Sequence, residues 1–308
     1  MRLITRSDFD GLACAVLLVE AGVVDTFKFA HPKDVQDGLV EVTENDVLAN
    51  VPYVKGCGLW FDHHSSEDER LLLEEEFHPK GMSRPAPSCA RVIYEYYGGA
   101  SKFAKLDASG LMTAVDRSDS GDLELDDIRD PKGWILLSFV MDPRTGLGRY
   151  RDYRIGNYQL MEEMIGYCRT MTAEQILALP DVAERVERYR AQQRAFEETL
   201  KANSRVDGNA IVTDFRDLDE IPSGNRFTVY ALFPAQNISI LVLWGKDKRN
   251  TVFSMGHSIV NRGSMTDVGS LMLRYGGGGH QKVGTCQVKN EDAERVLAEL
   301  VKRAKADG

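Results

Sequence analysis

The sequence predicts a two-part α/β protein, with a mainly parallel sheet flanked by helices, a helical connector and a smaller mixed α/β domain. Three patterns predict this fold: short apolar runs alternate with helical stretches, an amphipathic helical pattern follows, and closely spaced strand patterns come last. A chain of 308 residues with 43% hydrophobic content can bury two modest cores. We expect the parts to cover residues 1–171, 172–204 and 205–308.

In the first part, apolar runs that read as strands alternate with helical segments. The expected strands are "MRLIT", "TFKFA", "DVLANVP" and "GLWFD", and the expected helices are "LACAVLLVEAG", closed by Gly22, and "SCARVIYEYYG". This alternation predicts a Rossmann-like, parallel sheet, in which ligands bind beyond the carboxyl ends of the strands. Asp8, Asp10, Asn50 and the run 62–64 all follow predicted strand ends, so we expect them to converge.

The second half begins with the capping-box pattern "TAEQ" at Thr172, which predicts the start of a connector helix. Its packed face would hold Val182, Val186, Tyr189, Phe196 and Leu200. A mixed domain is expected from near Arg205. Its predicted strands are "AIVTDF", "FTVYALF", "ISILVLW", "TVFSMG" and "TCQV", and its predicted helices are "DVGSLMLRYG" and "EDAERVLAELVKR".

Composition narrows the class of protein. A net charge of -9 argues against a protein that follows long nucleic acid, because such binding neutralises many phosphates with a basic surface. The five cysteines form no CxxC pair, which favours reduced thiols and a cytoplasmic location. No uninterrupted apolar run has membrane-spanning length, so we expect no membrane association.

Acidic residues and histidines supply the candidate chemistry. "SDFDG" places Asp8 and Asp10 on a turn before a helix, where the plainer interpretation is a helix cap at Asp10. "FDHH" places His63 and His64 after a strand end, where a surface loop is the alternative. Carboxylate and imidazole donors together suit Mn²⁺ best, with Mg²⁺ as the alternative, and they do not suit a structural zinc site because no thiolates cluster here.

Four segments, in this order, resemble the motifs of the DHH phosphoesterase superfamily with its DHH-associated C-terminal domain. They are "SDFDG" (7–11), "FDHH" (61–64), "AVDRSD" (114–119) and "GGGGHQKVG" (276–284). The chain looks most like a subgroup that contains nano-RNases, 3′-phosphoadenosine-5′-phosphate phosphatases and exopolyphosphatase-like proteins. The resemblance spans nearly the whole chain.

The resemblance implies a Mn²⁺-preferring hydrolase with two metal ions about 3.5–4 Å apart, which activate water for an in-line displacement. It implies a set of metal ligands that we carry over residue by residue: Asp8, Asp10, His63 and Asp116. It also implies that Asp62 orients or ligates, that His64 touches the scissile phosphate, and that the chain forms a homodimer.

Two positions depart from the family pattern. Arg6 stands where members commonly have a histidine, and a guanidinium cannot bind a metal, so Arg6 is expected to contact phosphate instead. Asn50 stands where members usually have a metal-bridging aspartate, and its neutral amide should weaken binding of a second ion. We therefore expect one or two Mn²⁺ ions per chain.

The last motif is expected to bind the substrate. Glycine backbone N–H groups can approach a phosphate closely, and a tight turn is the alternative. The expected binding residues are Gly277, Gly278, Gly279, His280, Lys282 and, by its resemblance to a family position, Arg262. Ser88 is expected to cap a helix.

Three functions fit these patterns. The first is a metal-dependent phosphoesterase acting on small phosphate-containing substrates such as short oligoribonucleotides or 3′-phosphoadenosine-5′-phosphate, with an exopolyphosphatase-like hydrolase as its variant. The second is a nucleotide-binding regulatory protein with a degraded metal site. The third is an exonuclease for large substrates, which the acidic composition disfavours.

Overall fold

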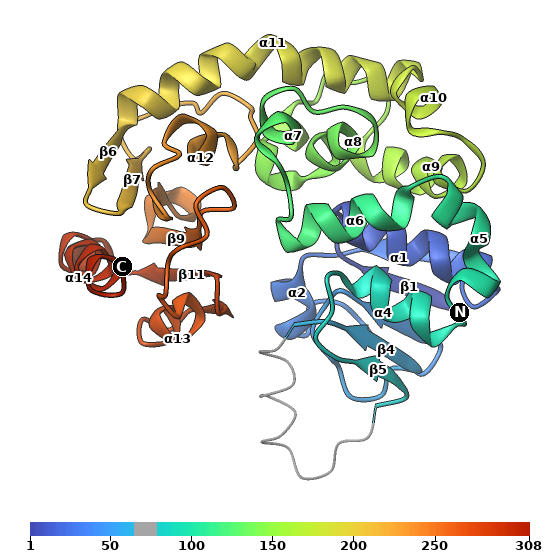
Figure 1. The fold of residues 1–308 in the computed structure, drawn as a ribbon. Helices are drawn as coiled ribbons and strands as arrows, with labels where there is room; N and C mark the ends of the chain where they lie inside the picture. The colour runs from blue at the N-terminus through green and yellow to red at the C-terminus, as the bar shows by residue number, and fades with distance from the viewer. Residues whose placement is uncertain (65–78) are drawn as a thin grey trace. The chain divides into compact units, whose positions relative to one another are not determined.

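The computed structural model describes residues 1–64 and 79–308, which form two compact units (Figure 1). The first unit contains Met1–Asp122 and Pro131–Tyr189, and the second contains Leu123–Asp130 and Arg190–Gly308. Residues 123–130 thus belong to the second unit although the chain on both sides of them belongs to the first. Among the described residues, no helix is both long and apolar enough to cross a membrane.

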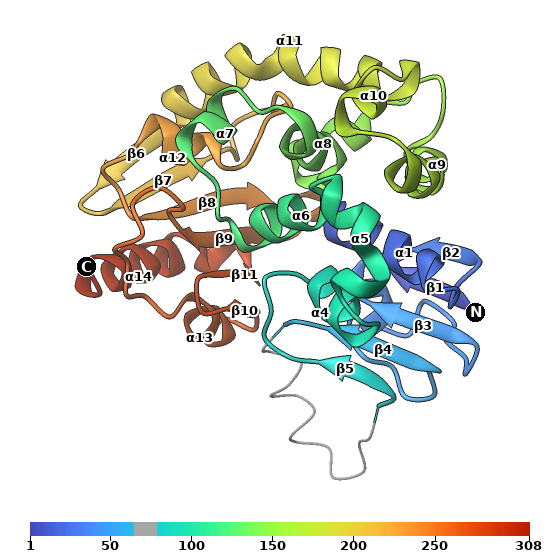
Figure 2. The ribbon, with the colours of Figure 1, turned by 45° about the vertical axis from the view of Figure 1, so that its right-hand side comes forward.

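The first unit is built on a parallel sheet with the strand order β2-β1-β3-β4-β5 (Figure 2). The strands are β1 (Arg2–Thr5), β2 (Thr26–Phe29), β3 (Asp46–Ala49), β4 (Leu59–Asp62) and β5 (Gly81–Ser83). The chain leaves β1 toward β2 on one side and returns to place β3 on the other. In such sheets the crevice at this reversal, outside the carboxyl ends of the strands, is where ligands bind.

Helices complete the first unit and confirm the predicted alternation. They are α1 (Phe9–Glu20), α2 (Pro32–Gln36), α4 (Cys89–Tyr96), α5 (Ala100–Ala108), α6 (Leu111–Ser120), α8 (Gly133–Met141), α9 (Asn157–Thr170) and α10 (Ala173–Leu177). Helix α1 is buried along nearly its whole length and packs against α4, α6 and α9. A separate core joins Val35 of α2 to Ile4, Leu48 and Trp60 of the sheet. The sheet therefore has buried side chains on both faces, as parallel sheets require.

The connector consists of two helices rather than one. Thr172 forms the predicted capping box, but the helix that it starts, α10, ends at Leu177. Helix α11 (Pro180–Asn203) begins at Pro180, because proline suits the first turn of a helix and disfavours helical geometry in the residue before it. The five residues predicted for the packed face are all buried, which confirms the helical periodicity.

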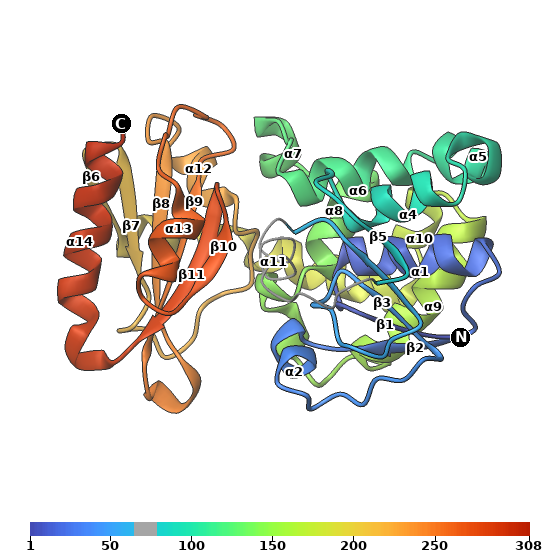
Figure 3. The ribbon, with the colours of Figure 1, turned by 90° about the horizontal axis from the view of Figure 1, so that it is seen from below.

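The second unit contains a mixed sheet with the strand order β10-β11-β9-β8-β7-β6 (Figure 3). The strands are β6 (Ser204–Asp207), β7 (Ala210–Asp214), β8 (Ile238–Trp244), β9 (Thr251–His257), β10 (Gly278–His280) and β11 (Val283–Val288), and the helices are α7 (Leu125–Arg129), α12 (Thr228–Leu232), α13 (Val268–Leu273) and α14 (Ala293–Ala306). Helices α13 and α14 share one core with this sheet. Within the described part of this second sheet, only β7 and β8 pair in parallel.

The segment "FTVYALF" was predicted to be a strand, and this prediction was wrong, because it forms α12. A short apolar run does not by itself distinguish a strand from a buried helix. Asn225 starts the turn by accepting the Phe227 N–H through its side chain. The Tyr230 hydroxyl, 2.8 Å from Ser239 Oγ, then anchors α12 to the face of β8 opposite the core residues Ile238 and Ile240.

Candidate metal centre

The predicted polar residues of the first unit gather at the carboxyl edge of its sheet. Arg6 and Asp8 follow β1, Asn50 follows β3, and His63 and His64 follow β4. Two further segments contribute, namely the start of α4 through its backbone N–H groups and the C-terminal half of α6 through the Asp119 side chain. The convergence predicted from the strand ends is therefore present.

Asp8, rather than Asp10, caps helix α1, because its Oδ1 accepts the Gly11 N–H at 3.0 Å. Gly11 is needed here because a Cβ at that position would lie 1.9 Å from the Arg6 carbonyl oxygen. This close approach brings the start of α1 against the end of β1. The glycine of "SDFDG" thus sets the position of both aspartates.

Asp10 is buried and held by the start of helix α4. Its Oδ1 accepts the Ala90 N–H at 2.8 Å and its Oδ2 accepts the Cys89 N–H at 3.0 Å. Burial, together with Asp119 and Asp8, raises the pKa of Asp10 well above its usual range despite these two hydrogen bonds. A bound cation would offset that cost, since it favours the charged carboxylate.

His63 presents one ring nitrogen to the acidic residues. Its Nδ1 lies 3.2 Å from the Ala86 carbonyl oxygen, which only accepts, so Nδ1 carries the proton of the neutral ring. Its Nε2 lies 3.3 Å from Asp119 Oδ2 and 3.9 Å from Asp10 Oδ2. Ligand atoms of these three residues all lie within 4.8 Å of one another. Such an arrangement, with the second ring nitrogen fixed by a carbonyl, is typical of metal-binding histidines.

The resemblance implied Asp116 as the metal ligand of "AVDRSD", but the structure gives Asp116 and Asp119 different partners. Asp116 Oδ1 accepts the Ser88 hydroxyl at 2.7 Å, and its Oδ2 accepts Arg91 Nε at 2.9 Å. Asp119, not Asp116, reaches His63 and Asp10. Because residues three apart on α6 are neighbours on one face, spacing alone could not choose between them. Ser88 caps α4 as predicted, by accepting the Arg91 N–H.

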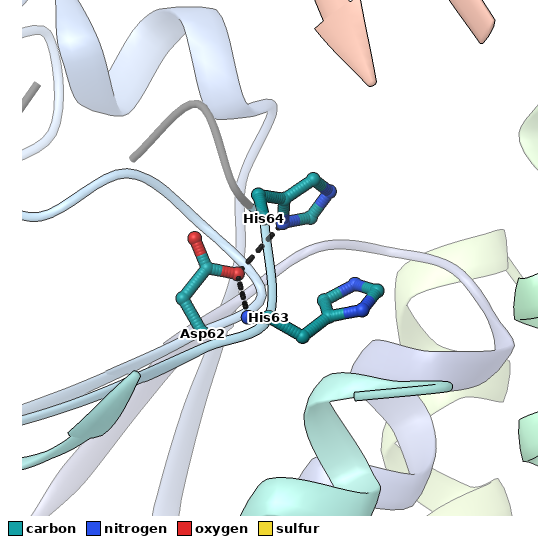
Figure 4. Close-up of side chains that lie close together, drawn as sticks. All are labelled: Asp62, His63 and His64. Atoms are coloured by element: carbon teal, nitrogen blue, oxygen red, sulfur yellow. Dashed lines mark hydrogen bonds and ion pairs between the residues drawn. The ribbon is translucent and has the colours of Figure 1, made fainter. Parts of the chain in front are cut away.

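Asp62 contacts the two histidines that follow it in the chain (Figure 4). Its Oδ1 accepts the His63 N–H at 2.8 Å and lies 2.7 Å from His64 Nδ1. Its Oδ2 is buried and has no hydrogen-bond partner among the described residues. Burial opposes the charge on His64, but Asp62, Asp119 and Asp10 outweigh burial and raise the pKa of His64 to about 9.

Two arginines lie at this edge. Arg6 Nε is 2.9 Å from Asp8 Oδ2, in an ion pair that turns its charge toward the site. Arg144, which sequence reasoning missed, follows α8 and pairs with Asp142, with 2.7 Å between Nε and Oδ1. Burial opposes its charge, but Asp142, Asp8 and Asp119 raise the pKa of Arg144. Its only sequence signal was a charged turn after the apolar helix.

The candidate substrate-binding residues lie in the second unit. Gly278, Gly279 and His280 form the edge strand β10, and Lys282 lies in the turn to β11. A Cβ at Gly279 would lie 2.2 Å from the Val283 carbonyl oxygen, and one at Gly277 would lie 2.1 Å from that of Thr285. These two glycines are therefore required for packing against β11. A Cβ at Gly278 would meet nothing closer than Leu273 at 4.0 Å. Arg262 lies in the exposed loop after β9, with its Nε donating to the Ile259 carbonyl oxygen at 3.0 Å.

The donors of the first unit fit a divalent cation. Two carboxylates and an imidazole converge, one carboxylate is buried with a raised pKa, and the nearby Asp62 Oδ2 is buried without a partner among the described residues. Oxygen and imidazole ligands in this combination suit Mn²⁺ or Mg²⁺. The fold and the donor set together define a divalent-metal centre at the edge of a parallel sheet.

Comparison with known proteins assigns the class. The pGpG-specific phosphodiesterase PggH from Vibrio cholerae is 46% identical to this chain, with a TM-score of 0.79 and coverage of 100% of this chain and 99% of that one. The DHH domain of a protein from a ribosomal-protein family has a TM-score of 0.59 at 14% identity, covering 99% of this chain and 86% of that one. RecJ from Thermus thermophilus, in complex with Mn²⁺, has a TM-score of 0.50 at 14% identity and covers 99% of this chain and 52% of that one. The last two likenesses concern the fold alone.

The chain belongs to the DHH phosphoesterase superfamily. It is a phosphoester hydrolase, and its group of Asp10, His63 and Asp119 has the donors to hold a divalent metal ion. A scan against family models finds no match. Among curated proteins, the A-adding tRNA nucleotidyltransferase of Aquifex aeolicus is 24% identical over 253 residues, which are 76% of this chain and 27% of that protein. The chain thus spans only 27% of the length of that relative.

Proposed function

We propose that this protein hydrolyses short linear dinucleotides of the pGpG type to mononucleotides. The 46% identity to a pGpG-specific phosphodiesterase over essentially the whole of both chains supports this substrate class. The net charge of -9 also favours a short substrate, because a few local donors can bind its phosphates without a broad basic surface.

The observation that carries the proposal is the convergence of Asp10, His63 and Asp119 at the carboxyl edge of the sheet. We assign these three residues as ligands of a divalent ion. Mn²⁺ is the expected ion, with Mg²⁺ as a substitute, because imidazole binds Mn²⁺ better than it binds Mg²⁺. A divalent cation at this position supplies a Lewis acid and lowers the pKa of a nearby water molecule.

The remaining residues at the edge orient and bind the phosphodiester. Asp62 fixes the His64 ring through Nδ1, which directs Nε2 away from Asp62 (Figure 4). His64 then donates a hydrogen bond from Nε2 to an oxygen of the scissile phosphate. Two carboxylates near the reacting phosphate would repel it, and the positive charge on His64 reduces that repulsion.

We propose that residues 1–171 form the catalytic domain with the metal chemistry, that residues 172–204 are the helical connector, and that residues 205–308 form the substrate-binding domain. In the last part, Arg262, His280 and Lys282 supply side-chain donors, and the backbone around Gly278 supplies an N–H group. Gly278→Ala tests that contact because its Cβ has room. It should raise KM while the protein stays folded, whereas Gly277→Ala should destabilise the fold. Equal KM for wild type and Gly278→Ala would remove this glycine from the substrate site.

The test of the proposed function is product release by the purified chain with Mn²⁺, with Mg²⁺ and with a chelator. The substrates are pGpG, pApA, 3′-phosphoadenosine-5′-phosphate, polyphosphate and a longer oligoribonucleotide. Cleavage of one phosphodiester bond of pGpG by water gives two molecules of 5′-GMP. We expect metal-dependent release of GMP from pGpG, and no release by His63→Ala.

Other outcomes would replace the proposal. Turnover of polyphosphate but not of dinucleotides would make the chain an exopolyphosphatase-like enzyme. Binding of pGpG without turnover in any metal would make it a nucleotide-binding regulatory protein. We also propose a homodimer, which light scattering on the purified chain would test by giving a mass twice that of the 34.4 kDa monomer.

A further inference from the structure

Asp8 is already bound by three groups of the chain. Its Oδ1 accepts the Gly11 N–H at 3.0 Å and Asn50 Nδ2 at 3.2 Å, and its Oδ2 lies 2.9 Å from Arg6 Nε. The carboxylate is buried, with its residue 5% exposed. A cation at Asp8 would have to displace a guanidinium, which stays protonated and repels it.

Asn50 is shaped for this contact. Its backbone has a φ of 56°, in the left-handed region that asparagine tolerates better than most residues. The end of β3 therefore turns the amide toward Asp8, and the amide donates rather than accepts there. Arg144 adds a second permanent positive charge, which interacts with Asp8 and Asp119.

We propose that this centre binds a single divalent ion, at Asp10, His63 and Asp119, and that the guanidinium of Arg6 replaces a second ion by binding the scissile phosphate. This inference rests on the metal site of the proposed function. Two groups of described residues place donor atoms within 4.8 Å of one another, Asp10 with His63 and Asp119, and Asp62 with His63 and His64. In the second group His64 Nδ1 is already bound to Asp62 Oδ1 at 2.7 Å, and the nearby Asp8 carboxylate is neutralised by Arg6, so the first group is the one left for an ion. A guanidinium offers several N–H groups in a planar fork, so pairing with Asp8 through Nε leaves the fork's other donors to meet phosphate oxygens.

The first measurement is the number of Mn²⁺ ions per chain, by calorimetric titration and by metal analysis after gel filtration. Electron paramagnetic resonance distinguishes an isolated Mn²⁺ ion from an exchange-coupled pair. We expect one ion per wild-type chain with the spectrum of an isolated ion. Arg6→His combined with Asn50→Asp exchanges the guanidinium for an imidazole and the amide for a carboxylate. This double variant should gain a second ion and a coupled spectrum.

The second measurement is the affinity of the Mn²⁺-loaded protein for GMP. Arg6→Ala should weaken GMP binding and lower kcat by about 10²-fold, the usual effect of removing one donor to a developing charge. It should leave the number of bound Mn²⁺ ions at one. Arg6→Lys is the conservative variant; it keeps the charge but loses the fork, and it should recover part of the loss. Circular dichroism of both variants checks that they fold.

Two bound ions with a coupled spectrum in the wild type would overturn the inference. Unchanged GMP affinity in Arg6→Ala and Arg6→Lys would overturn the role of Arg6. These readouts do not depend on turnover. If one ion binds and pGpG is not cleaved, the proposed substrate is rejected and the single-ion centre stands. If two ions bind and pGpG is cleaved, the single-ion centre is rejected and the proposed substrate stands.

Discussion

Replacing Asp119 by asparagine tests the metal centre most sharply, because Asp116 lies three residues earlier on the same helix and serves as a matched control. Asp119 Oδ2 lies 3.3 Å from His63 Nε2, inside the proposed ligand group. Loss of a residue that only supports a metal ligand costs 10–100-fold in affinity, so loss of a ligand should cost at least about 10²-fold, or roughly 2.7 kcal/mol. We expect Asp119→Asn to lose Mn²⁺ binding to that extent.

Asp116→Asn should act on stability instead. Asp116 accepts hydrogen bonds from Ser88 Oγ at 2.7 Å and from two Arg91 nitrogens at 2.9 and 2.5 Å. The Asp116 side chain is 18% exposed and that of Arg91 is 22% exposed. An asparagine retains one acceptor but loses the charge. Because the pair is only partly buried and thus partly screened, we expect a loss of about 1–2 kcal/mol in the free energy of unfolding.

Calorimetric titration with Mn²⁺ and urea denaturation of both variants separate the two effects. Asp119→Asn should bind Mn²⁺ weakly, and Asp116→Asn should bind it as the wild type does but unfold at lower urea. The reasoning is refuted if Asp116→Asn loses the metal while Asp119→Asn keeps it. In that case the carboxylate of Asp116 would have to leave Arg91 when the ion binds.

Three further predictions concern residues around the site and at the other end of the sheet. Burial favours protonation of Asp46, but Arg2 and the Thr43 donors outweigh it and lower its pKa. Asp46→Asn should therefore lower the free energy of unfolding by about 2 kcal/mol at neutral pH. The difference in unfolding free energy from wild type should vanish as the pH falls below about 3.9, the ordinary pKa of aspartate, and through the lowered pKa of Asp46. A difference that stays constant in urea titrations from pH 7 to pH 3 would contradict this prediction. Gly11→Ala should destabilise the fold by at least about 2 kcal/mol, since its Cβ would overlap the Arg6 carbonyl oxygen, and an unchanged melting temperature would disprove that contact. His64→Gln should lower kcat by about 10²-fold with Mn²⁺ affinity unchanged, whereas weakened Mn²⁺ binding would make His64 a ligand.

Local signals in the sequence determined much of the fold. The four strands predicted for the first sheet, the cap at Ser88 and the capping box at Thr172 are all present because each depends on residues close together in the chain, whereas the short edge strand β5 was not predicted. The buried face of α11 follows from helical spacing for the same reason. The strand predicted for the segment that forms α12 was wrong because burial against a sheet overrides a short strand-like pattern.

By itself, the sequence determined the family and the edge of the sheet at which the chemistry gathers, because motif order and strand ends are one-dimensional features. Only the tertiary structure decided which carboxylates meet. It placed Asp119 beside His63, paired Asp116 with Arg91, and bound Asp8 to Arg6. The first two pairings join segments far apart in the chain, and differences of a few ångströms between neighbouring side chains select all three. No spacing rule encodes such distances, since they arise from how α1, α4 and α6 pack together.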